Sequence, residues 1–174
     1  MTSSIFIRLG GLAAILGGVV YTAVGLLVPF LQSLLFILLA PGAMAAIAAL
    51  HVLQKERYGL LGALASLTAF TSIALVLVSS LGIADGLPWP IPERIFTVGS
   101  LVVAVSMLAL GAVTIAVREL PRWCGASLVV GGIIFAGWLV VPMVWLLEGV
   151  VWALVGYAVF RAGARLPERS SRVR

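Results

Sequence analysis

The chain has 174 residues, of which 63% are hydrophobic and 10% are charged, and its formal net charge is +5. Soluble domains carry about 25% charged residues, so this composition excludes a water-soluble fold and predicts a protein embedded in lipid. The single cysteine and the single histidine exclude an internal disulfide, a thiolate metal cluster and a bis-histidine haem. We therefore expect neither a metal nor a cofactor.

Six apolar runs follow one another along the chain. About 20 residues at 1.5 Å each cross a hydrocarbon core of about 30 Å, and lipid offers no partner to free backbone groups, so each run is predicted to be a helix. The runs are Leu9–Val28, Leu31–Leu53, Tyr58–Ile83, Ile95–Val117, Trp123–Val141 and Met143–Phe160. The sequence thus predicts an all-α bundle of six transmembrane helices in one domain, residues 1–162, followed by a basic tail, residues 163–174.

The basic residues indicate how the bundle is oriented. If the chain starts inside and six helices alternate, only Arg94 falls outside. The residues that fall inside are Arg8, Lys55, Arg57, Arg118, Arg122, Arg161, Arg165, Arg169, Arg172 and Arg174. A single crossing over residues 123–160 would separate the last five arginines from Arg118 and Arg122. The positive-inside rule therefore favours both termini in the cytoplasm, with a turn near Pro142.

The basic tail also indicates the partners. Arginines that follow a membrane span attract anionic lipid headgroups, and this tail lacks the aromatic residues that stack on bases, so nucleic acid is not expected. The expected partners are the lipid bilayer, anionic headgroups at the tail, and a second copy of the chain or another membrane protein.

Glu148 is the strongest candidate for chemistry, because it is the only charged residue between Arg122 and Arg161. Counted from Arg161, it lies about 20 Å into a core of about 30 Å. Trp145 and Trp152 share its side of a helix, and a carboxylate between two indoles could hold a lipophilic cation. In the structural alternative, the tryptophans belong to the interfacial belt and Glu148 pairs with Arg94 or a hydroxyl group.

The secondary candidates are Asp85, Glu93 and Arg94 in the proline-rich segment 84–94, and His51 at the end of the second run. The segment is a lid, a docking surface or an interfacial cap, with Pro92 and Glu93 in the first helical turn. The acids Asp85, Glu93 and Glu148 belong to the outer side and could gather a cation there. His51 suits a helix C-terminus at the inner surface better than a catalytic role.

Two motifs carry a resemblance to a known group. The stretch "RLGGLAAILGGVVY" at residues 8–21, and "LPRW" at residues 120–123 before a glycine-rich run, resemble small bacterial multi-pass membrane proteins of unassigned function. The resemblance covers the first helix and the last two. It implies the bacterial inner (plasma) membrane and implies no activity or site residues.

Three functions remain open. The small number of polar and ionisable residues favours a non-catalytic membrane protein, such as a scaffold or a subunit of a complex. The alternative is a proton-coupled exporter of lipophilic cations that uses Glu148, Trp145 and Trp152. Its chemistry is similar to that of small multidrug exporters, although those have four helices and carry the acid in the first. The third is an intramembrane enzyme acting on a lipid or isoprenoid, which needs Glu148 close to Glu93, Asp85 or His51.

Overall fold

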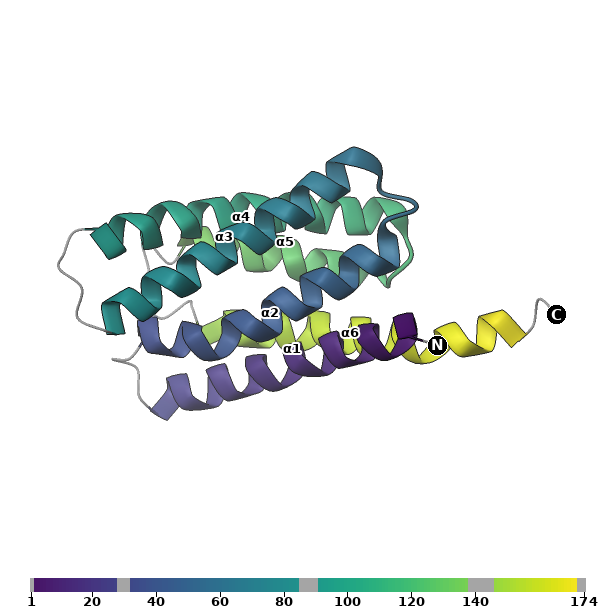
Figure 1. Cartoon of the computed structure of the whole chain (residues 1–174), viewed down its shortest axis with the longest axis horizontal. Coiled ribbons are helices and arrows are strands. Elements are labelled where there is room, and N and C mark those ends of the chain that lie inside the picture. Colours follow the sequence, from purple (N-terminus) through teal and green to yellow (C-terminus); the bar gives the residue numbers. More distant parts are fainter. Residues whose placement is uncertain (1, 28–31, 85–90, 138–145, 172–174) are drawn as a thin grey trace.

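The structure is a computed structural model that describes residues 2–27, 32–84, 91–137 and 146–171, and the side chains of most of them. The described residues form six α-helices and no strand, which confirms the predicted all-α fold (Figure 1). The helices are α1 (Thr2–Leu27), α2 (Gln32–Gln54), α3 (Gly59–Ala84), α4 (Ile91–Val117), α5 (Arg122–Gly137) and α6 (Leu146–Ser171).

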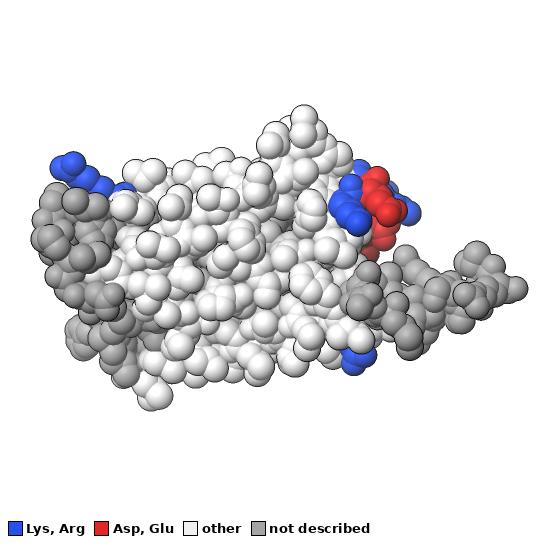
Figure 2. Space-filling view, viewed as in Figure 1, with Lys and Arg blue, Asp and Glu red and all other residues white. Residues whose placement is uncertain are grey.

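The bundle has the surface of a membrane protein. All of the helices except α5 are long and apolar enough to cross a bilayer, whereas α5 has 16 described residues and is about 24 Å long. Large apolar side chains face outward, and Leu61, for example, is 77% exposed. Figure 2 shows an uncharged middle, with charged side chains at the two ends. Outward-facing apolar side chains of this extent indicate contact with lipid.

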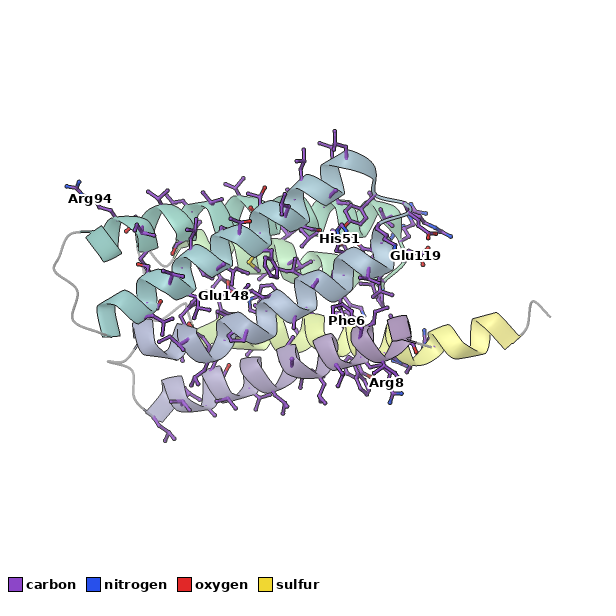
Figure 3. The ribbon with its side chains drawn as sticks, viewed as in Figure 1. Phe6, Arg8, His51, Arg94, Glu119 and Glu148 are labelled. Carbon is purple, nitrogen blue, oxygen red and sulfur yellow. The ribbon has the colours of Figure 1, made fainter. Side chains whose placement is uncertain are left out.

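The two ends of the bundle differ in charge. Arg8, His51 and Glu119 lie at one end and Arg94 lies at the other (Figure 3). The start of α1 and the end of α6 share the end of Arg8 (Figure 1), as an even number of helices requires. We call it the basic end, and its described cations include Arg8, Arg57, Arg161 and Arg165.

Close glycine contacts divide the helices into two groups. In the first group, α1 packs against both α2 and α6; in the second, α4 packs against both α3 and α5 (Figure 1). A Cβ atom on Gly11 of α1 would lie 2.5 Å from the Phe160 nitrogen of α6, and one on Gly111 of α4 would lie 2.7 Å from the Gly125 oxygen of α5. Backbones approach this closely only where side chains are absent, so each group is a tightly packed unit.

The boundary between the two groups, which we call the seam, is packed differently. It runs where α2 faces α3 and where α5 faces α6. Among the described glycines, every close approach to the backbone of another helix stays within one group. Across the seam, Gly131 of α5 instead meets the side chain of Val151 of α6, and Thr114 of α4 donates a hydrogen bond to Gln54 Oε1 of α2 at 3.3 Å. The seam is therefore held by side chains.

Three boundaries can be compared with the prediction. The sixth helix was expected to end at Phe160, but α6 continues to Ser171, so the tail begins as helix. Pro92 and Glu93 lie in the first turn of α4, as expected for a cap. The predicted turn at Pro142, and the middle of the proline-rich segment with Asp85, lie outside the described residues.

Candidate functional site

Glu148 lies in the first turn of α6 and is 2% exposed. Neither of its carboxylate oxygens has a hydrogen-bond partner among the described residues. Within the described part of the chain, the other buried side-chain polar atoms without a partner belong to Gln54 and Ser100, which carry no charge. An ionised carboxylate in such surroundings is costly unless a cation or several donors accompany it. Among the described residues, Glu148 is thus the buried acid whose carboxylate has neither a hydrogen-bond donor nor a cation to compensate its charge.

The carboxyl group lies on the seam. A Cβ atom on Gly131 of α5 would lie 3.6 Å from Glu148 Oε1, 2.9 Å from Val151 Cγ1 of α6 and 2.5 Å from Met107 Cε of α4. On the other side, the buried ring of Tyr21 of α1 packs against Gly149 and lies within electrostatic range of the carboxylate. The two groups of helices therefore meet around this acid.

The position of Trp152 contradicts the expectation that the tryptophans lie in the interfacial belt. Its indole approaches the Glu148 carboxylate and is 1% exposed. An indole in the interfacial belt faces the lipid headgroups, so the expectation that Trp152 belongs to that belt is wrong. Trp145 lies outside the described residues. The described aromatic residues that interact with Glu148 include Trp152 and Tyr21.

Arg94 does not neutralise Glu148. Its side chain is exposed at the end opposite the basic end (Figure 3), where it lines an apolar groove of about 470 Å³ between α3 and α4. Since the Glu148 oxygens have no described partner, the structural alternative of an ion pair with Arg94 is wrong. The side chains of Asp85 and Glu93 lie outside the described residues, so a gathering of these acids with Glu148 stays a prediction.

His51 belongs to a separate polar set at the basic end. Its Nδ1 atom is hydrogen-bonded to the Tyr58 hydroxyl, which also lies 3.3 Å from Ser66 Oγ. Burial raises the pKa of Tyr58, so this phenol keeps its proton at neutral pH. The set borders an apolar groove of about 330 Å³. Figure 3 shows His51 well away from Glu148, so these two residues do not form the pair that an intramembrane enzyme would need.

Tyr21 and Gly131 at the site were missed by sequence reasoning. Tyr21 is an aromatic residue within the first apolar run, and Gly131 belongs to a pair of glycines. Neither has a spacing that points to Glu148. Tyr21 lies more than a hundred residues before it, and Gly131 lies seventeen residues before it. A residue that acts by leaving space carries no chemical signal of its own.

The described residues contain no group of three or more histidine, cysteine, aspartate or glutamate side chains that could hold a metal ion. Comparisons with family models, with curated proteins and with solved structures found no match for this chain. The functional conclusion therefore rests on the geometry around Glu148.

Proposed function

We propose that the protein is a proton-coupled carrier of lipophilic cations, in which Glu148 exchanges a proton for the cation. The observation that carries the proposal is a buried carboxyl group without a described hydrogen-bond partner, located on the seam between two tightly packed groups of helices. Ionisable residues within membrane helices mark ion pathways and proton relays.

The electrostatics of a single buried acid suit such an exchange. A carboxyl group with its proton is neutral, and a carboxylate that holds a monovalent cation is neutral as a pair. Both states avoid the large cost of an uncompensated charge in a low-dielectric interior. Trp152 and Tyr21 add aromatic surfaces that attract a cation whose charge is spread over an apolar body. A proton and a lipophilic cation can thus alternate at Glu148.

The division of the bundle suits a rocking motion. Many transporters alternate their access by moving one rigid unit against another around a fixed site. Here close glycine contacts join α1 to α2 and α6, and α4 to α5, whereas side chains form the seam. At the basic end, the Thr114–Gln54 hydrogen bond and the Arg57–Glu119 ion pair, at 2.7 Å, join the two groups or their connections. Access from that end requires these contacts to separate.

A scaffold or subunit role explains less. The small number of polar residues favours it. However, a scaffold does not need a buried acid, since an apolar residue of similar volume at this position would cost less free energy. We therefore place the scaffold second.

We infer the orientation of the bundle from the positive-inside rule. The basic end faces the cytoplasm of a bacterium, where its arginines lie near anionic headgroups, and both termini are cytoplasmic. Glu148 then lies toward the outer side of the inner membrane.

Proton release tests the exchange. Purified protein in weakly buffered detergent is titrated with tetraphenylphosphonium, and a pH dye reports the protons released. We expect release from the native chain and none from Glu148→Gln. The matched control is Glu56→Gln, which changes an exposed acid and should behave like the native chain. Size-exclusion profiles show that each variant is folded. If the native chain releases no protons, or if Glu148→Gln releases as many, the carrier proposal is wrong.

A further inference from the structure

A small pocket opens at the basic end, far along α6 from Glu148. Its volume is about 120 Å³, and residues of α2, α5, α6 and the connection between α4 and α5 line it. At about 30 Å³ for a water molecule in the liquid, this is space for a few waters or for a headgroup, and not for a whole lipid. A ligand that fits must therefore keep most of its body outside.

Two arginines form one wall of the pocket. Arg161 and Arg165 of α6 both line it and both are exposed. Residues four apart lie on the same face of a helix, so the two guanidinium groups can converge on one anion. Guanidinium groups bind phosphate oxygens in pairs of parallel hydrogen bonds. The acid in the lining, Glu119, is ion-paired with Arg57 at 2.7 Å.

The rest of the pocket is apolar and aromatic. Leu53 and Leu120 form part of its lining, and Trp123 of α5 stands at its side. Trp123 stacks on Tyr157 of α6, with ring centroids 6.4 Å apart and an interplanar angle of 25°. Both rings are partly exposed, at 40% and 47%. Tryptophan and tyrosine prefer the depth of the lipid headgroups, so this pair places the pocket where the headgroups of a bilayer lie.

We propose that this pocket binds the phosphate headgroup of one anionic phospholipid, with Arg161 and Arg165 on the phosphate and the acyl chains along the lipid-facing surface beside Trp123. Basic pockets between transmembrane helices bind anionic lipid headgroups in this way. Because Trp123 belongs to the second group of helices and the arginines belong to the first, the bound lipid bridges the seam. The site is distinct from the general attraction of a basic tail, and it does not depend on the role of Glu148.

The experiment measures lipid retention and thermal stability of the full chain in detergent. Phosphatidylglycerol, phosphatidylcholine and inorganic phosphate are added in separate arms. We expect phosphatidylglycerol to raise the unfolding temperature and to remain bound in native mass spectra, while phosphatidylcholine and inorganic phosphate have little effect. A ligand that binds only the folded state stabilises it in this concentration-dependent way.

Three variants sharpen the test. Arg161→Gln/Arg165→Gln should weaken phosphatidylglycerol binding at least tenfold, and Arg161→Lys/Arg165→Lys should weaken it less, because lysine keeps the charge and loses the paired hydrogen bonds. The control Arg8→Gln/Lys55→Gln removes the same charge from exposed positions at the basic end that do not line the pocket, and it should bind like the native chain. The proposal is overturned if the control loses as much affinity as the Arg161/Arg165 variant, if that variant binds normally, or if inorganic phosphate matches the lipid.

Discussion

Glu148 Oε1 on α6 lies 3.6 Å from the position that a Cβ atom would occupy on Gly131 of α5. With no side chain at residue 131, nothing from that position shields the carboxyl group from the second group of helices. The same position is crowded by Met107 Cε at 2.5 Å and Val151 Cγ1 at 2.9 Å, which are the ends of side chains and can shift. Gly131 therefore controls the space at the acid more than it controls the approach of two backbones.

Alanine substitution at this glycine should mainly affect cation binding, whereas substitution at its neighbour should mainly affect stability. Gly131→Ala should weaken tetraphenylphosphonium binding by about tenfold, which is about 1.4 kcal/mol, because its methyl group narrows the site. Gly132→Ala should mainly reduce stability, by about 1–3 kcal/mol, because its Cβ would lie 2.7 Å from the Ala104 carbonyl oxygen. Binding titrations and thermal unfolding in detergent measure the two effects. Equal effects of both variants on binding would contradict this assignment.

Replacement of the acid by its neutral isostere should leave the fold intact. Since Glu148 makes no hydrogen bond with a described residue, Glu148→Gln removes no partner and should change the free energy of unfolding by less than about 1 kcal/mol at neutral pH. Glu148→Ala should cost more, about 1–3 kcal/mol, because it leaves a cavity. Denaturation of the purified variants measures both. A large loss in Glu148→Gln would mean that the carboxyl group has a structural role.

The pair Gly17 and Gly18 tests the packing of α1 within the first group. A Cβ atom on Gly18 would lie 2.8 Å from the Ala153 nitrogen of α6 and closer still to the Gly149 oxygen, whereas one on Gly17 would lie 3.4 Å from the Leu38 oxygen of α2. Gly18→Ala should therefore destabilise the protein by about 1–3 kcal/mol. Gly17→Ala should be neutral or stabilise by up to about 1 kcal/mol, as alanine favours helix. Thermal unfolding of both variants checks this, and equal stability would show that α1 and α6 do not pack this closely.

Composition and apolar runs were enough to predict six helices, because these follow from the physics of lipid as a solvent; they gave a depth for Glu148 but not its burial among the helices. The end of α6 was not predictable from hydropathy, since an apolar run reports where a helix leaves lipid and not where it ends. Its continuation to Ser171 includes alanine, leucine and arginine, which favour helix. The burial of Trp152 depends on how α1 and α5 pack against α6, which the hydropathy of the apolar runs does not report.

Tyr58 should make stability sensitive to alkaline pH. Burial raises its pKa above the ordinary value of 10.0, so the folded state holds the proton more strongly than the unfolded chain. Its contribution is therefore fully present below about pH 10 and is lost as the pH rises through the folded-state pKa. Tyr58→Phe should be less stable by about 1 kcal/mol at pH 8, because the hydrogen bonds to His51 and Ser66 are gone.

This deficit of Tyr58→Phe should shrink above pH 10. In that range the unfolded native chain is stabilised by ionisation of Tyr58, whereas Tyr58→Phe has no phenol to ionise. Unfolding temperatures of the two proteins at both pH values measure the difference. A deficit that stays constant or grows with pH would contradict the sign.

Labelling of single cysteines should test the proposed orientation. Thr2→Cys and Ser171→Cys should resist a membrane-impermeant maleimide in intact cells and react after lysis, whereas Arg94→Cys should react in intact cells. The native Cys124 is buried, so the native chain serves as the background control. Labelling of residues 2 and 171 from opposite sides would exclude an even number of crossings.

The exchange of a proton for a cation at Glu148 is tested most directly by infrared difference spectroscopy of the protein in lipid, before and after tetraphenylphosphonium is added. The account predicts that the native chain loses a protonated carboxyl C=O band and gains carboxylate bands, and that Glu148→Gln shows neither change while Glu56→Gln shows both. A native chain whose carboxyl band is unaltered by the cation, or an equal change in Glu148→Gln, would contradict it.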